Sequence, residues 1–188
     1  MLIARVSWTA LLAVALSGAA LASARAQAAP ALGLAAGASI PARGFGDRVS
    51  AGYHVMATLA VRAPRYPLSF RAEGLFHELD YNAEVGPSGG APYRAVERSA
   101  RVWGATANGI LKSSGLLGTY LIAGVGGYRV TEAVPLLGGT RTDGRFGVNA
   151  GGGFLFELTG FSTYVEARYH WVGDSDVRLV PITFGVSF

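Results

Sequence analysis

The sequence contains no cysteine and few charged residues. None of the 188 residues is Cys, which excludes disulfide scaffolds, zinc-thiolate sites and cysteine nucleophiles. Only 15% of the residues are charged, and the net charge of +4 comes without any basic run, so we expect no nucleic-acid partner. Glycine is abundant instead, with 27 residues, about twice its usual share, which argues against a helical bundle. The length predicts one domain.

The first 28 residues have the pattern of a secretory signal peptide. A short basic start precedes an apolar run over 6–21, and small residues at Ala24, Ala26 and Ala28 provide A-x-A cleavage sites. The apolar run is shorter than the roughly 20 residues that a membrane-spanning helix needs. We therefore expect residues 1–28 to be a signal peptide cleaved after Ala28, and residues 29–188 to form the mature domain.

From residue 29 onward, apolar residues alternate with small or polar ones. This two-residue period is typical of β-strands with two different faces. It recurs in eight segments, at about 32–40, 49–61, 68–77, 103–111, 119–130, 146–157, 165–171 and 180–188. Each segment is near the 9–11 residues that cross a bilayer as a tilted strand, and an even number allows an antiparallel barrel to close. The sequence predicts an all-β, eight-stranded, antiparallel up-and-down transmembrane β-barrel. The register of 119–130 stays open, although Gly124 and Gly126 are expected inside, beside Tyr120 and Tyr128.

The connections between these segments alternate in length. Those at 62–67, 112–117 and 158–162 are short, whereas those at 41–48, 80–97 and 131–144 are longer. The short connection near 173–177 breaks this trend. Short periplasmic turns and longer external loops are typical of outer-membrane barrels. The longest loop is the expected contact surface for a partner that the sequence does not identify, with candidate contacts at Tyr81, Tyr93, Arg94 and Arg98.

Aromatic residues gather at two levels of the predicted barrel. Such rings are typical of the two interfaces between a membrane and water. The expected outer belt, at the external ends of the strands, consists of Tyr53, Phe76, Trp103, Phe146, Tyr169 and Trp171. The expected inner belt, at the opposite ends of the strands, consists of Phe70, Phe154, Phe156 and Phe188.

The last nine residues are apolar at every second position and end in Phe188. The alternating residues are Val180, Ile182, Phe184, Val186 and Phe188. This terminus resembles the barrel-assembly signal of the small eight-stranded outer-membrane β-barrel proteins, the superfamily that includes OmpA transmembrane domains, OmpX and OmpW. Pro181 departs from the pattern and puts the start of the last strand in doubt. The resemblance covers about residues 31–188. It implies export across the inner membrane, transit with periplasmic chaperones, insertion by the barrel-assembly machinery and contact with outer-membrane lipid.

The predicted interior carries ionic residues of both signs. Segments three and seven lie opposite each other in an eight-stranded ring and carry Arg71 and Glu73, and Glu166 and Arg168, in reversed order. Counting along the strands places Arg71 at the level of Glu166 and Glu73 at the level of Arg168. Because side chains just fill the interior of such a barrel, we predict a cross-barrel quartet that plugs the lumen. Pairing with an adjacent strand or a trapped water is the alternative.

Three histidines complete the predicted polar network of the lumen. His54, His77 and His170 point inward by the alternation, but they come from three strands without a close ligand spacing, so we expect hydrogen bonding and no metal. No cofactor is expected either.

The favoured function is a non-enzymatic outer-membrane barrel, expected to be a monomer, with a structural or surface-interaction role or acting as a narrow conduit for small or hydrophobic molecules. Two alternatives remain. A lipid-modifying barrel enzyme, similar to lipid A deacylases or palmitoyl transferases, needs a His, a Ser and an acid together. No Ser occupies the matching place after His170, and Ser39, Ser50 and Ser69 have no evident base, so no catalytic residue is assigned. A soluble lipocalin-like lipid carrier would have its apolar residues inside, the reverse of the predicted arrangement.

Overall fold

The chain forms a closed β-barrel of eight strands, in which each strand pairs with its neighbours in sequence. The computed structural model describes residues 30–47, 49–63, 66–80, 99–113, 117–134, 139–173 and 176–188. The predicted signal peptide, residues 1–28, lies outside the described residues, as does the loop of residues 81–98 that holds Tyr81, Tyr93, Arg94 and Arg98. The strands are β1 (Ala31–Pro41), β2 (Gly52–Arg62), β3 (Leu68–Asp80), β4 (Ser99–Lys112), β5 (Leu117–Val134), β6 (Gly139–Leu158), β7 (Phe161–Val172) and β8 (Arg178–Ser187).

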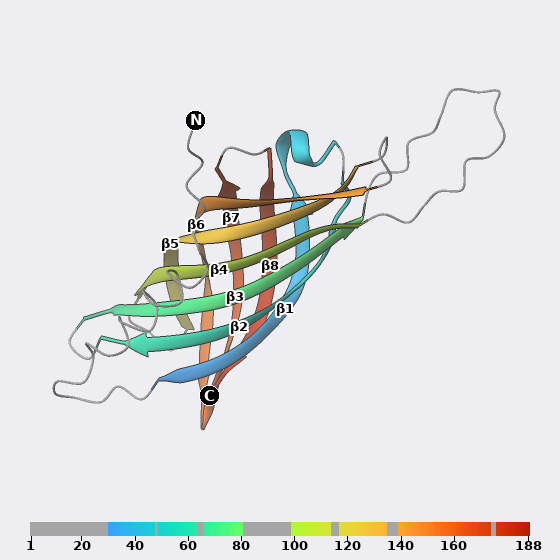
Figure 1. The fold of residues 1–188 in the computed structure, drawn as a ribbon. Helices are drawn as coiled ribbons and strands as arrows, with labels where there is room; N and C mark the ends of the chain where they lie inside the picture. The colour runs from blue at the N-terminus through green and yellow to red at the C-terminus, as the bar shows by residue number, and fades with distance from the viewer. Residues whose placement is uncertain are drawn as a thin grey trace, which may run out of the picture.

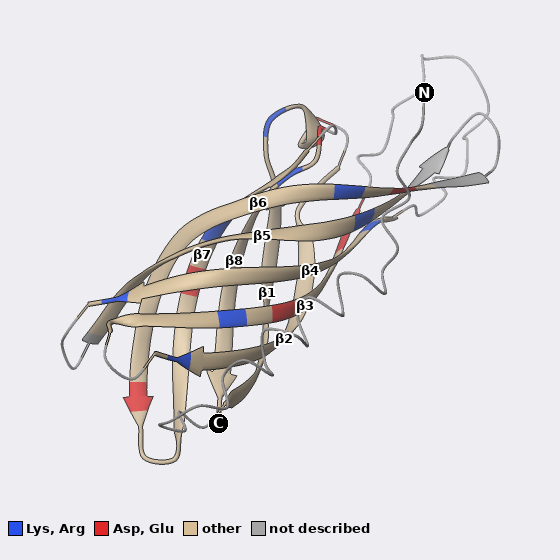
Figure 2. Cartoon of the chain, turned by 60° about the vertical axis from the view of Figure 1, so that its left-hand side comes forward, with Lys and Arg blue, Asp and Glu red and all other residues tan. Residues whose placement is uncertain are grey.

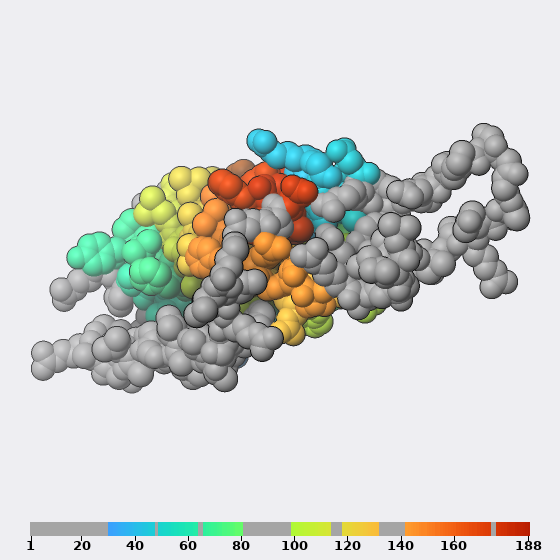
Figure 3. Space-filling model, turned by 45° about the horizontal axis from the view of Figure 1, so that its top comes forward, coloured from blue at the N-terminus to red at the C-terminus, as the bar shows by residue number. Residues whose placement is uncertain are grey.

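All eight pairings are antiparallel, and the strands wrap around the barrel with a strong tilt (Figure 1). The ring closes where β1 meets β8, and the main chains of Leu32 and Phe188 exchange two hydrogen bonds of 3.0 and 2.7 Å there. At the other end of the same seam, Ala42 N–H donates to the carbonyl oxygen of Arg178. In the space-filling view, the cyan segment that follows β1 lies beside red atoms of the C-terminal part of the chain (Figure 3). The predicted fold class is confirmed.

The two ends of the barrel differ in their connections. At one end, which we call the turn end, the strands are joined by residues 63–67, 113–116 and 159–160, and both β1 and β8 have their outer termini there. The opposite end, the loop end, carries the connections 42–51, 81–98, 135–138 and 173–177. The prediction of a loop over 131–144 is wrong in its extent, because β5 continues to Val134 and β6 begins at Gly139. The β5–β6 ladder continues from Thr131↔Thr142 to Val134↔Gly139, because an antiparallel hairpin can extend beyond the barrel wall while keeping its main-chain bonds.

The outer surface of the barrel is apolar. Side chains such as Leu34, Leu121 and Phe184 are 70%, 66% and 57% exposed, while their sequence neighbours face inward. A water-soluble barrel would reverse this order, because exposing contiguous apolar side chains to water is unfavourable. Within the described residues, no helix has both the length and the apolar composition to cross a membrane.

Inward glycines make room for three tyrosine rings. A Cβ atom added at Gly153 would contact the ring of Tyr120 on the adjacent strand, and one added at Gly185 would meet the ring of Tyr164. Gly147 lies in the same way beside Tyr128. Large rings inside a narrow barrel therefore require small residues opposite them, which is one reason for the glycine content of this chain. Gly124 and Gly126 also face inward, which settles the register of β5.

Two local expectations need correction. The alternation predicts Val49 on the outward face of the second strand, but β2 begins at Gly52 and Val49 is buried at the loop end. The doubt about Pro181 also resolves, because β8 begins three residues before it, at Arg178. The β7–β8 ladder is present at Ala167↔Ile182 and again at His170↔Leu179, and Pro181 lies in the gap, as a residue without an N–H donor requires.

Candidate functional site: the polar lumen

Four charged side chains form a closed ring of ion pairs in the middle of the barrel. Across the lumen, Arg71 Nη2 donates to both carboxylate oxygens of Glu166 at 2.8 and 2.6 Å, and Arg168 Nη1 donates to Glu73 Oε2 at 2.8 Å. Along β3, Arg71 Nε donates to Glu73 Oε1 at 2.6 Å. Along β7, Arg168 Nε lies 2.7 Å from Glu166 Oε1, close enough for an ion pair although the angle is not that of a hydrogen bond. Each carboxylate therefore contacts both guanidinium groups.

The sequence explains why these four residues meet. Arg71 and Glu73 share the inward face of β3, and Glu166 and Arg168 share that of β7. The cartoon coloured by charge shows the blue and red positions of the two strands on opposite walls (Figure 2). All four side chains are almost completely buried. Charges removed from water in this way need partners of opposite sign, and the two strands supply an equal number of each.

Neutral side chains complete the hydrogen bonding of the charged ring. Thr106 Oγ1 donates to Glu73 Oε2, and the hydroxyl of Tyr120 donates to Glu166 Oε2, both at 2.7 Å. Asn149 Oδ1 accepts from Arg168 at 3.3 Å, and Arg168 Nη2 also lies 3.3 Å from the sulfur of Met56. Carboxylates that accept several charge-assisted hydrogen bonds are held in one geometry, so the ring is a rigid cross-brace.

The histidines form a second polar layer nearer the loop end. His54 and His77 face each other with ring centroids 5.3 Å apart, and His77 and His170 have centroids 6.1 Å apart. The hydroxyl of Tyr128 is 2.9 Å from His170 Nδ1, and His54 Nε2 is 2.9 Å from Thr183 Oγ1. Within the described residues, no group of three or more His, Asp or Glu side chains is arranged to hold a metal ion.

The expectation that Ser39 has no base beside it is wrong, because two imidazole groups lie next to its hydroxyl. Its Oγ is 2.6 Å from His77 Nδ1 and 3.2 Å from His54 Nδ1. The sequence did not indicate this contact, because His77 lies on β3, two strands from Ser39, and reaches it across the narrow interior. Ser39 is fully buried, and His77 Nε2 has no hydrogen-bond partner among the described residues. A nucleophile needs substrate access and an oriented base, and this pair has neither.

Apolar side chains fill the barrel at the loop end. Phe45, from the short 3-10 helix η1 (Arg43–Phe45), is only 1% exposed and belongs to the same buried cluster as Val49, Leu79 and Leu179. The other members of this cap are Ala100, Val102, Val130, Val172 and Val177. The lumen is thus layered from the loop end as an apolar cap, a histidine layer and a ring of charges.

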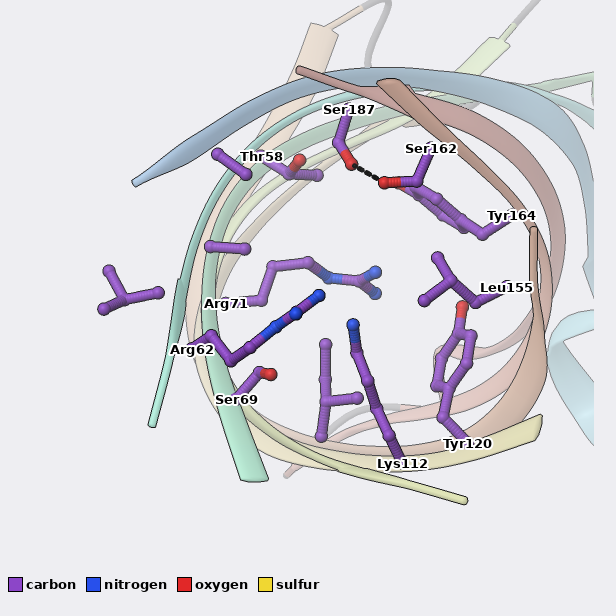
Figure 4. A pocket seen from close by; sticks show the side chains of 14 residues that line it. Thr58, Arg62, Ser69, Arg71, Lys112, Tyr120, Leu155, Ser162, Tyr164 and Ser187 are labelled. Atoms are coloured by element: carbon purple, nitrogen blue, oxygen red, sulfur yellow. Dashed lines mark hydrogen bonds between the residues drawn. The ribbon is translucent and has the colours of Figure 1, made fainter. Parts of the chain in front are cut away.

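A pocket of about 280 Å³ occupies the lumen at the turn end. It begins at Arg71 and is lined mainly by inward residues near the strand ends, including Arg62, Ser69, Lys112 and Tyr164. Viewed along the barrel, the guanidinium groups of Arg62 and Arg71 and the ammonium of Lys112 point into the same space (Figure 4). The packed side chains that fill the rest of the lumen therefore leave an open space at this end.

The aromatic residues of the two expected belts face away from the lumen. In the outer set, the rings of Phe76 and Trp103 have centroids 4.5 Å apart, which leaves Phe76 half-buried, and Tyr53 packs edge-on against Phe76. The exposed members are Tyr53, Trp103, Phe146, Tyr169 and Trp171 in the outer set, and Phe70, Phe154, Phe156 and Phe188 in the inner set. Phe161 joins the inner set, since its ring centroid lies 6.3 Å from that of Phe188.

The C-terminal residues of the expected assembly signal lie in and just after β8. Ile182, Phe184 and Phe188 are exposed on the outer surface, while Val180 and Val186 are partly covered. Their order along the strand follows the alternation in the sequence.

The sequence did not identify several inward-facing residues as members of the polar network. They are Ser39, Met56, Thr106, Asn108, Asn149, Tyr164 and Thr183. The alternation places each of them inside, but a neutral side chain gives no indication of its level or its partner. Polarity on an inward position was the available signal for all of them except the apolar Met56.

Comparison with known proteins identifies the fold. No family model matches the chain, and no curated protein matches it in sequence. Among solved structures, neisserial surface protein A superposes with a TM-score of 0.57 at 16% identity, over 84% of this chain and 94% of that one. A major outer membrane protein from Thermus thermophilus gives 0.54 at 14% identity, over 85% and 98%. Together with the closed ring of eight strands, these likenesses show that the chain has the fold of the small outer-membrane β-barrel proteins.

Proposed function

We propose that this protein is a non-enzymatic integral barrel of the outer membrane, with a structural or surface-interaction role and a lumen closed to solutes. The fold and the apolar outer surface support a membrane location. Two observations support a non-catalytic role: Ser39, which lies beside His77, is fully buried, and the lining of the turn-end pocket that holds Ser69, Ser162 and Ser187 contains no His, Asp or Glu. In this proposal the turn end faces the periplasm and the loop end faces the exterior, as the connection lengths favour.

The single observation that carries the closed lumen is the stack of filled layers. A solute entering from the loop end would meet the Phe45 cap, then the histidine layer, and then the ring made by Arg71, Glu73, Glu166 and Arg168. Breaking that ring would leave buried charges unpaired, which is energetically costly. Barrels with open aqueous pores have about 16 strands, twice the number in this chain.

The proposal also assigns partners. Outer-membrane lipid would contact the apolar outer surface, with the two aromatic sets at its interfaces. Periplasmic chaperones and the barrel-assembly machinery would deliver the chain, reading the terminal residues up to Phe188. Because all strand edges are paired within one chain, the barrel needs no second copy for closure, and we propose a monomer.

We expect planar-bilayer recordings of the purified protein to show no stable conductance step. The same preparation should migrate differently on a gel when folded and when boiled, which proves that the inserted barrel is intact. A regular ohmic step in each insertion event would contradict the closed lumen and favour a narrow conduit. Loss of the gel shift, with recovery of the protein in a detergent-free soluble fraction, would contradict the membrane location itself.

A further inference from the structure

The pocket at the turn end is cationic, and no acid lines it. Its three charged lining residues are Arg62, Arg71 and Lys112, and none of its lining residues is Asp or Glu. Arg71 is neutralised on its far side by Glu73 and Glu166. Arg62 donates to Glu157, but this pair is exposed to solvent on both sides, at 61% and 60%. Exposed pairs of this kind exchange readily for other partners.

Lys112 is the third positive charge of the pocket. It is the single lysine of the chain, and its side chain extends inward from the last residue of β4. Within the described residues its ammonium forms no ion pair and no hydrogen bond, although it is half-buried and interacts electrostatically with Arg62 and Arg71 and with the more distant carboxylate of Glu157, which Arg62 already binds. A partly desolvated cation beside two others is unfavourable unless an anion joins it.

Hydroxyl groups line the same space. The Tyr164 hydroxyl has no hydrogen-bond partner in the described part of the chain, although the residue is only 3% exposed. Ser69 and Thr58 also line the pocket, and Ser162 and Ser187 are 3.4 Å apart across its rim. Buried polar groups usually have partners, so a hydroxyl without one in the lining of a cationic pocket is consistent with a missing acceptor.

We propose that this pocket binds a small organic anion, a phosphate or carboxylate group on a short apolar chain. Lys112 and Arg62 would bind the anionic group, with Tyr164 or Ser69 as hydroxyl donors, because charge-assisted hydrogen bonds are the strongest that such an anion can receive. Ile110 and Leu155, which line the same pocket, would contact the apolar chain. The volume of about 280 Å³ suits a molecule of this size. The site faces the periplasm if the orientation proposed above holds, but binding itself does not depend on orientation.

The test is calorimetric titration of the protein in an alkyl maltoside detergent, which carries no competing phosphate. The probes are n-butyl phosphate, n-pentanoate and neutral n-pentanol. We expect saturable binding of at least one anion and none of the alcohol. Tighter binding of butyl phosphate assigns the site to phosphate-bearing molecules, and tighter binding of pentanoate assigns it to carboxylates.

The variant Lys112→Gln should weaken anion binding about tenfold or more, because it removes the unpaired charge. The matched control is Arg129→Gln, which removes a positive charge from the outer surface of β5 and should leave binding unchanged. A shift between folded and boiled samples on a gel verifies that both variants are intact barrels. The proposal is overturned by absence of saturable anion binding, by equal binding of pentanol, or by equal losses in the two variants. None of these results bears on the closed lumen, which the conductance recordings test separately.

Discussion

Replacing Arg71 with Met is expected to destabilise the barrel by about 3–5 kcal/mol, because it breaks a buried pair and leaves charge uncompensated. The variant leaves Glu73 and Glu166 buried with a single guanidinium group between them, that of Arg168. Glu166→Gln should cost a similar amount, since it leaves two guanidinium groups with one carboxylate. The measurement is the free energy of unfolding in denaturant for protein refolded into lipid vesicles.

The double variant separates pairing from simple loss of packing. Arg71→Met combined with Glu166→Gln restores electrical balance, because Glu73 and Arg168 remain paired at 2.8 Å. Its cost should therefore fall short of the summed single costs by about 1–3 kcal/mol. Arg62→Met with Glu157→Gln is the matched control cycle, and its coupling should be below about 1 kcal/mol because that pair is exposed. Additive effects at Arg71 and Glu166 would show that the cross-barrel pair contributes no coupling of its own.

Placing Arg at Val125 tests the lipid-facing surface. Val125 lies at the middle of β5, faces outward and is 47% exposed. We expect Val125→Arg to cost about 2–4 kcal/mol, because the new charge would lie near the bilayer midplane. Leu111→Arg, near the turn end of β4, should cost only about 0–1 kcal/mol, as its side chain can reach the interface. Unfolding in vesicles again provides the measurement. Equal small costs at both positions would indicate that the outer surface faces water.

The sequence was sufficient to predict which residues share a face of each strand, because successive side chains of a strand point to opposite faces. The apolar residues then mark one face and the small or polar residues the other. The same alternation placed Arg71 and Glu73 opposite Glu166 and Arg168, since strands three and seven of eight face each other. Charge order along each strand then indicated the pairing. These inferences needed no knowledge of side-chain conformation.

Neutral contacts could not be predicted in this way. Whether Tyr120 reaches Glu166, or Ser39 reaches His77, depends on the stagger between strands, which the alternation does not specify. The length of the β5–β6 hairpin was missed for a different reason. Residues 131–144 are rich in Gly and Thr, which are common in loops, but a ladder of main-chain hydrogen bonds holds most of them in strands.

The cationic pocket illustrates the same limit. Lys112 is visible in the sequence as a single lysine among many arginines, but its convergence with Arg62 and Arg71 depends on how the side chains of three adjacent strands reach into one space. Nothing in the sequence around each residue indicates this meeting.

Site-directed spin labelling is the most direct test of which face contacts lipid. The chain has no native cysteine, so single labels can be placed at Phe70, on the outer surface, and at Ser69, which lines the turn-end pocket. In lipid vesicles, the label at position 70 should collide frequently with oxygen, which concentrates in hydrocarbon, and the label at position 69 should not. Higher oxygen accessibility at position 69 than at position 70 would contradict the account, because it would place the polar face of the strand against the acyl chains.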